Sequence, residues 1–189
     1  MARGDVLVAG VGRLDRRDDG VGLVVAAALL EKRLRGVDVV TLATPISLLE
    51  AWVGYRRVVV VDAVLSGRPG GSVRVEQVGA DPLPARGGSG GTHAVGIPEV
   101  IELGRALGSL PEELTIVGVE VTDVGFGAGL SPRVATAVGE ASRVVAAIAS
   151  GAALIQPAMP SVRAEDRTVS AWLARSAGTS SAGIGREYK

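Results

Sequence analysis

The sequence predicts an α/β protein, a three-layer α/β/α sandwich with a mostly parallel central sheet in a phosphorylase/hydrolase-like or flavodoxin-like arrangement. Apolar, β-branched runs alternate with helical patterns through residue 150 of the 189-residue chain, as expected for a parallel sheet covered by helices. Hydrophobic residues make up 47% of the chain and aromatic residues only 3%, so Val, Leu, Ile and Ala must build the core. We expect one domain over residues 1–155 and a flexible C-terminal tail, residues 156–189, with at most one short helix.

Five segments are predicted to be strands. Residues 5–11 form a short apolar run ended by glycine, which is typical of a buried strand. Residues 56–64 contain four consecutive valines, which cannot all face water and therefore predict burial on both faces of the sheet. Residues 71–78 alternate valine with polar residues and predict an edge strand. The other two predicted strands are residues 37–43 and 113–121.

The segments between these strands predict four helices, over residues 20–35, 45–53, 94–107 and 130–150. Pro45 and Pro98 are expected in the first turns of their helices, where proline costs no hydrogen bond. Ser131 is the expected N-cap of the last helix, with Pro132 just inside it. Residues 79–93 show no periodicity and predict a long loop, a kind of segment that is often functional.

Composition excludes several classes of function. The chain has 20 basic and 20 acidic side chains, so no net charge attracts it to nucleic acid or to an anionic membrane. It has no cysteine, which excludes disulfides, thiolate metal sites and cysteine nucleophiles, and which fits a reducing compartment. The first apolar run is too short and wrongly flanked for a secretory signal or a membrane span, so we expect a cytoplasmic protein.

The glycine-rich segment GVGRLDRRDDGVG, residues 10–22, lies where a nucleotide-binding loop would begin. A G-x-G-x-x-G motif would need a third small residue at position 15, which is Asp15. Asp18 and Asp19 follow, and three carboxylates at a helix N-terminus repel a phosphate more than the helix dipole attracts it. The loop is therefore predicted not to bind phosphate, although a nucleotide- or flavin-binding α/β protein stays an alternative for the chain.

A cation site is the second hypothesis for this edge of the sheet. Asp19 precedes a helix, Asp62 ends a buried strand, and His93, the single histidine of the chain, ends the long loop. These positions meet at the carboxyl edge of a parallel sheet, and two carboxylates with an imidazole suit a divalent transition metal. The alternatives are that Asp18 or Asp19 caps the helix, that Asp62 is a turn residue and that His93 is structural.

Two kinds of metal-free hydrolase differ in how well they fit the sequence. An acid protease could pair Asp18 or Asp19 with Asp62, because two carboxylates can share a proton and activate water. A serine hydrolase is disfavoured because the sequence has no G-x-S-x-G motif, and Ser89 is better explained as part of a glycine-rich loop.

Several stretches together resemble the hydrogenase maturation proteases, endopeptidases that remove a C-terminal extension from the large subunit of nickel-iron hydrogenases. The stretches occur in the family's order and cover residues 5 to about 150. They are VLVAGVGRLDRRDDGVGLVVAAAL, VVVVDAV, THAVGIPEVIELGRALG, LTIVGVEV and GLSPRVATAV.

The resemblance implies roles for the acidic residues and the histidine. Asp19, Asp62 and His93 match the family's metal-binding and catalytic positions, and Asp18 matches the acidic neighbour of the first. The implied partner is a hydrogenase large-subunit precursor, whose own nickel is recognised before cleavage, and a monomer is the expected form. A non-catalytic metal-sensing assembly factor for the same subunit is the alternative.

The sequence departs from the family pattern near the first loop. Arg13 stands where the family usually has Asn, and together with Arg16 and Arg17 it predicts a basic rim around the site. The segment of residues 41–52 lacks a paired glycine that is frequent in the family, the loop at residues 84–91 is long, and the tail beyond residue 157 has no match. These differences concern the identity of the substrate more than the fold.

Overall fold

The computed structural model describes residues 5–79 and 96–151, so the predicted tail and most of the long loop lie outside the described residues. One sheet has the strand order β2-β1-β3-β5-β4. Neighbouring strands are parallel except β4, which runs antiparallel to β5 at the edge, and this confirms the mostly parallel sheet and its predicted edge strand. The strands are β1 (Val6–Val11), β2 (Val37–Leu42), β3 (Arg57–Val64), β4 (Val73–Gln77) and β5 (Glu113–Glu120).

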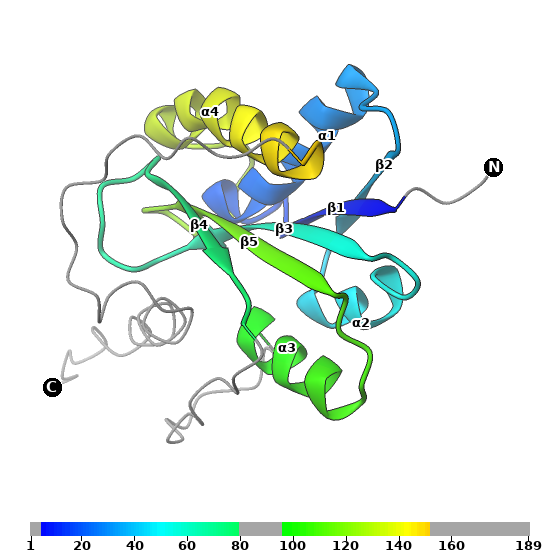
Figure 1. The fold of residues 1–189 in the computed structure, drawn as a ribbon. Helices are drawn as coiled ribbons and strands as arrows, with labels where there is room; N and C mark the ends of the chain where they lie inside the picture. The colour runs from blue at the N-terminus through cyan, green and yellow to red at the C-terminus, as the bar shows by residue number, and fades with distance from the viewer. Residues whose placement is uncertain (1–4, 80–95, 152–189) are drawn as a thin grey trace, which may run out of the picture.

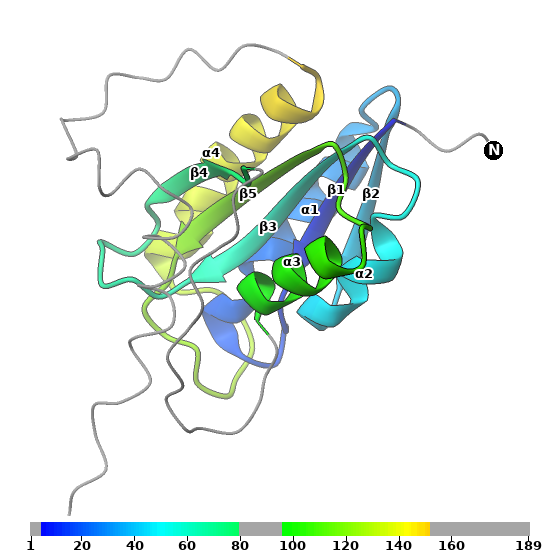
Figure 2. The ribbon, with the colours of Figure 1, turned by 60° about the horizontal axis from the view of Figure 1, so that its bottom comes forward.

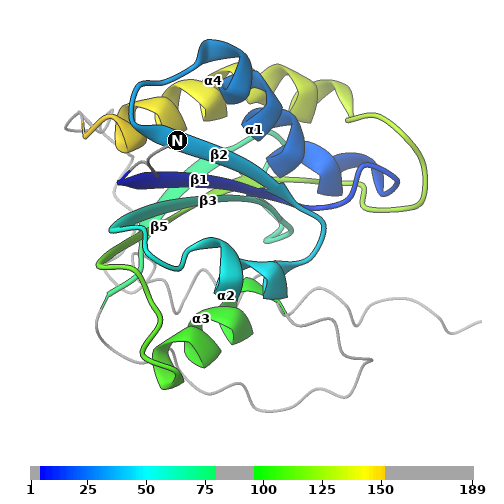
Figure 3. The same ribbon diagram turned by 90° about the vertical axis from the view of Figure 1, so that its right-hand side faces the viewer.

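Helices cover both faces of the sheet, so the predicted three layers are confirmed (Figures 1 and 3). One face packs against α1 (Val21–Lys32) and α4 (Pro132–Ala149), and the other against α2 (Leu48–Ala51) and α3 (Ile97–Ala106). Two short 3-10 turns, η1 (Arg17–Gly20) and η2 (Pro45–Ser47), precede α1 and α2. None of the helices in the described ranges has the length and apolar character needed to cross a membrane.

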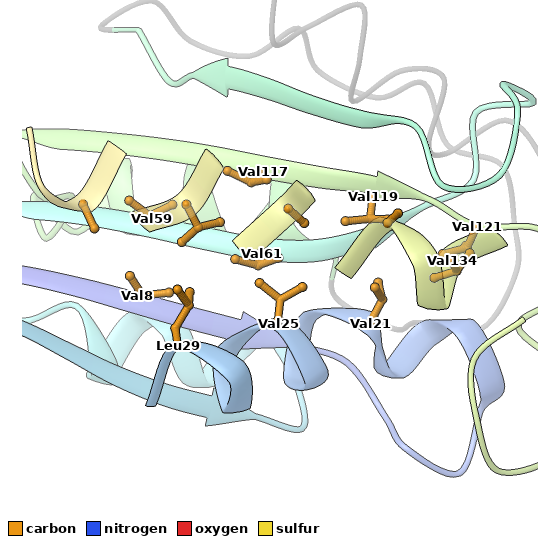
Figure 4. Packing of buried hydrophobic residues seen from close by; sticks show 14 of the residues in the cluster. Val8, Val21, Val25, Leu29, Val59, Val61, Val117, Val119, Val121 and Val134 are labelled. Carbon is orange, nitrogen blue, oxygen red and sulfur yellow. The ribbon is translucent and has the colours of Figure 1, made fainter. Parts of the chain in front are cut away.

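The four valines of β3 are fully buried, as their sequence predicts, and they point alternately to the two helix layers. Val59 and Val61 pack under α1 and α4 (Figure 4), whereas Val58 and Val60 pack against α2 and α3. By the same alternation, Asp62 lies on the face that α2 and α3 cover. The strand therefore runs through the apolar core and places the Asp62 carboxylate near the carboxyl edge of the sheet.

The order of the strands reverses beside β1. From β1 the chain passes through α1 to β2 on one side, and then through α2 to β3 on the other side of β1 (Figure 2). Ligands of such sheets bind in the crevice at the carboxyl ends of the two strands that flank this reversal. Asp19 follows β1 and Asp62 lies near the end of β3, so the topology places both carboxylates at the reversal.

Several element boundaries differ from the predicted ones, among them the ends of α1 and β3. Helix α1 stops at Lys32 instead of continuing to residue 35, because Arg33 takes a left-handed conformation with φ 48°. Strand β3 does not end at Asp62, since Val64 still pairs with Glu120 of β5. On the other side, β3 pairs with β1 only as far as Val61, so Asp62 is the first residue of β3 beyond its β1 neighbour.

Candidate functional site

Glycines let the first turn of α1 rest directly on the central strands. A Cβ atom at Gly22 would lie 2.3 Å from the carbonyl oxygen of Val11 and 2.4 Å from that of Val61. A Cβ atom at Gly10 would lie 2.2 Å from the carbonyl oxygen of Gly22. Any side chain at these positions would push the helix off the sheet. The glycines of the first loop thus serve helix-strand packing, which agrees with the prediction that the loop does not cradle a phosphate.

Gly12 turns the chain back over the end of β1. Its φ of +142° is a conformation that L-residues rarely adopt, and a Cβ atom there would lie 2.0 Å from the carbonyl oxygen of Asp19. The Gly12 amide donates to the carbonyl oxygen of Leu42 at 3.1 Å, which fixes the turn to β2. This close approach holds Asp19 at the carboxyl end of β1.

Asp19 and Asp62 are two carboxyl groups that interact with each other. Burial, and secondly the charge of Asp19, raise the pKa of Asp62 from its ordinary value to about 7, and the Ala63 backbone amide opposes this rise. Part of the Asp62 side chain nevertheless remains accessible. Burial also raises the pKa of Asp19, against the Arg13 backbone amide and the positive charges of Arg16 and Arg13. The site therefore concentrates negative charge where water solvates it poorly.

Such a pair can be stabilised by a proton or by a cation. A proton on one carboxyl relieves the repulsion, which is the chemistry of a paired-carboxylate acid protease. A divalent cation relieves it as well, because carboxylate oxygens are its usual ligands. Both hypotheses from the sequence can use Asp19 and Asp62, and the metal hypothesis adds His93, so the two carboxyl groups are compatible with either chemistry.

The third predicted ligand, His93, lies outside the described residues. Among residues 5–79 and 96–151, no three His, Cys, Asp or Glu side chains are placed to hold a metal ion together. The structure thus brings Asp19 and Asp62 together, and the convergence of His93 with them stays a prediction.

Asp18 has a structural part in the fold. Its side chain is fully buried, and its carboxylate accepts hydrogen bonds from the backbone amides of Thr122 at 3.4 Å, Asp123 at 3.2 Å and Ser131 at 2.6 Å. The Ser131 hydroxyl adds a fourth, at 2.9 Å. The hypothesis that Asp18 or Asp19 caps α1 is wrong, because the N-cap residue is Gly20 and no side chain caps this helix.

Ser131 is the N-cap residue of α4, as predicted, but its hydroxyl does not cap that helix. It donates to Asp18 instead, and the Ser131 amide does the same. The start of α4 is thereby fixed to η1, and sequence patterns gave no sign of this connection because the two segments are 113 residues apart.

The predicted basic rim is largely neutralised. Arg13 forms an ion pair with Asp15 at 2.7 Å, and Arg17 forms one with Asp123 at 3.1 Å. Arg16 donates two hydrogen bonds, of 3.2 and 3.1 Å, to the carbonyl oxygen of Val124. The loop between β5 and α4 is therefore bonded to the loop that carries Asp19, a contact that no local sequence pattern indicates.

Comparisons with known proteins agree on one class of enzyme. The family model described as "Hydrogenase maturation protease" matches residues 27–148, a range that includes Asp62 and His93 and begins after Asp19. No curated relative matches the chain by sequence.

Solved structures of the same class superpose on the chain. The hydrogenase maturating endopeptidase HybD from E. coli is 25% identical with a TM-score of 0.63, and the match covers 77% of this chain and 93% of that one. The NiFe hydrogenase maturation protease HybD from Thermococcus kodakarensis is 27% identical with a TM-score of 0.60, over 76% of this chain and 98% of that one.

Proposed function

Because this chain belongs to the hydrogenase maturation protease family and its fold is that of solved endopeptidases of this class, we propose a specific reaction for it. It removes the C-terminal extension of a nickel-iron hydrogenase large-subunit precursor after the metal has been inserted. The precursor is its partner, and the reaction takes place in the cytoplasm. The nickel arrives with the precursor and is part of the substrate.

The observation that carries this proposal is the interaction between Asp19 and Asp62. Each carboxyl has a raised pKa, so each gains from a nearby positive charge. None of the ion pairs within the described residues satisfies either carboxylate. With the imidazole of His93, these oxygens make a donor set suited to Ni²⁺. A precursor that carries nickel supplies the missing charge, and one that lacks it does not.

We infer the roles of Asp19 and Asp62 from their places near the carboxyl ends of β1 and β3. Asp19 and Asp62 contact the nickel and orient the precursor, so that its extension lies across the carboxyl edge of the sheet. A metal ion held there polarises a peptide carbonyl and acidifies a bound water. Asp62, with a pKa of about 7, is also suited to accept a proton from water at neutral pH. The same residue thus serves recognition and hydrolysis.

The test is to incubate the chain with a large-subunit precursor that does or does not contain nickel, and to follow loss of the C-terminal peptide by intact mass. We expect cleavage of the nickel form only. Asp62→Asn and His93→Ala should abolish cleavage, whereas Asp15→Asn, on the same loop as Asp19 and exposed, should not. Equal cleavage of both forms would favour the paired-carboxylate acid protease, and binding without cleavage would favour the assembly factor.

A further inference from the structure

A second loop, residues 121–131 between β5 and α4, lies beside the loop that carries Asp19 (Figure 3). The amide of Arg17 donates to the carbonyl oxygen of Gly127 at 2.9 Å, and the amide of Gly127 donates to that of Asp15 at 2.9 Å. The Asp18 amide donates to the Asp123 carbonyl oxygen at 3.1 Å. These hydrogen bonds, with the buried Asp18 carboxylate, join the two loops into one unit at the carboxyl edge of the sheet.

The joined loops hold an aromatic side chain out in solvent. Phe126, the single phenylalanine of the chain, is 79% exposed. Its backbone is held in place, because its carbonyl oxygen accepts a hydrogen bond from Arg17 Nε at 3.3 Å and the Gly127 amide donates to the Asp15 carbonyl oxygen. On the first loop Leu14 is 60% exposed. Large apolar side chains that are exposed on an ordered backbone mark surfaces where a partner binds.

The positive charge of Arg16, beside Phe126, indicates which kind of group the partner presents. The Arg16 guanidinium lies 5.6 Å from the centre of the Phe126 ring, and its N–H groups donate to the neutral carbonyl of Val124. Unlike Arg13 and Arg17, Arg16 forms no ion pair in the part of the chain that the structure describes, although its charge lowers the pKa of both Asp19 and Asp15. The surface therefore combines an aromatic ring with a guanidinium group whose N–H groups bond to a neutral carbonyl instead of a carboxylate.

We propose that Phe126 and Arg16 anchor the hydrogenase precursor. They bind a segment that presents an apolar side chain next to a carboxylate, and this contact sets the position of the precursor relative to Asp19. The inference rests on the proposed function and adds a docking residue to it. Arg16 lies three residues before Asp19 on the same rigid loop, so a partner seated on Phe126 is held at the candidate site.

A second copy of this chain is a less suitable occupant of the surface. Phe126 and Arg16 lie on the two joined loops beside Asp19. A second copy that bound there would occupy the place of the precursor. The exposed apolar side chains of the surface are Phe126 and Leu14, whereas a stable homodimer needs a broad apolar interface.

The experiment compares Phe126→Ala with the matched control Leu107→Ala in steady-state cleavage of the nickel-loaded precursor. Leu107 is 64% exposed and lies just after α3, on the way to the start of β5 and away from the carboxyl ends of the strands. We expect Phe126→Ala to raise KM about tenfold and to leave kcat within about twofold of wild type, as for loss of an aromatic anchor. Leu107→Ala should leave both constants unchanged. Arg16→Gln should raise KM and weaken its dependence on salt.

Each result has one interpretation. If the wild-type chain cleaves the precursor and Phe126→Ala has the KM of wild type, the anchor proposal is overturned and the proposed function stands. Failure of the wild-type chain to cleave any nickel-loaded precursor overturns the proposed function itself. Thermal unfolding of each variant shows whether the fold is kept, and a fall in kcat with unchanged KM contradicts the anchor. Sedimentation that finds a wild-type dimer, with a Phe126→Ala monomer of unchanged KM, assigns the surface to a second copy.

Discussion

The carboxylate of Asp18 accepts hydrogen bonds from both the backbone amide and the hydroxyl of Ser131, at 2.6 and 2.9 Å. Asp19, the next residue, interacts instead with Asp62. Two neighbouring carboxylates at the start of one helix therefore have different surroundings: hydrogen-bond donors surround one, and a second carboxyl group lies near the other. Hydrogen-bond donors stabilise a buried carboxylate, whereas a second carboxyl group destabilises it. Replacing Asp18 should therefore lower the stability of the fold, and replacing Asp19 should raise it.

Asp18→Asn is predicted to destabilise the protein. An asparagine keeps one acceptor oxygen but turns its NH₂ group either toward the Ser131 amide, which donates to Oδ1, or toward the Asp123 amide, which donates to Oδ2, so a donor faces a donor in both orientations. Loss of charge-assisted hydrogen bonds in a buried position should lower the free energy of unfolding by about 3 kcal/mol. Urea unfolding measures this, with the exposed Asp15→Asn as the control. A change below about 0.5 kcal/mol, the size typical of a surface substitution, would contradict the structural role of Asp18.

Asp62→Asn is predicted to stabilise the metal-free protein above pH 7. The folded-state pKa of Asp62 is about 7 against an ordinary 3.8, so between these values the native state binds more protons than the unfolded state. Its contribution to stability therefore falls as pH rises from about 4 to 7, by at most about 4 kcal/mol. Asparagine cannot ionise, so the variant does not lose this stability as the pH rises. Urea unfolding at pH 4 and pH 8 should show a gain for the variant at pH 8 only, and an equal gain at both would argue against the raised pKa.

The sequence was sufficient for the architecture because apolar periodicity decides which segments are buried. Four valines before Asp62 required a strand buried on both faces, and this strand lies at the centre of the sheet. The alternation of strands and helices predicted a parallel sheet, and a parallel sheet places both candidate carboxylates at its carboxyl edge. These inferences need only local patterns and the rule that parallel strands share a carboxyl edge.

The parts that sequence could not provide depend on contacts between distant segments. Asp18 and Asp19 are the same residue type at adjacent positions, and only the approach of Ser131 separates their roles. The exposure of Phe126 follows from a loop whose hydrogen-bond partners lie more than 100 residues earlier in the chain. No local pattern in either segment points to the other.

The pKa of Asp62 is predicted to fall when Asp19 is replaced by asparagine. The charge of Asp19 is the second contribution that raises the Asp62 pKa to about 7, after burial, so its removal should leave an intermediate value that burial alone sustains. Carboxyl ¹³C chemical shifts of the metal-free protein, followed against pH, measure this directly. Asp15→Asn serves as the control, because the charge of Asp15 does not contribute to the raised pKa of Asp62. An unchanged Asp62 titration in Asp19→Asn would mean that the two carboxyls do not interact.

Gly22→Ala and Gly139→Ala are predicted to have opposite effects, although both glycines lie in helices. A Cβ atom at Gly22 would lie 2.3 and 2.4 Å from two backbone oxygens of β1 and β3, neither of which can rotate away. The helix must then shift, and we expect a loss of at least about 2 kcal/mol and a displaced Asp19. At Gly139 of α4 a Cβ atom meets nothing within 4 Å, so alanine should stabilise the helix by about 0.5–1 kcal/mol. Thermal unfolding compares the two. A neutral Gly22→Ala would show that α1 is not pressed against the strands, and the positioning of Asp19 would then need another cause.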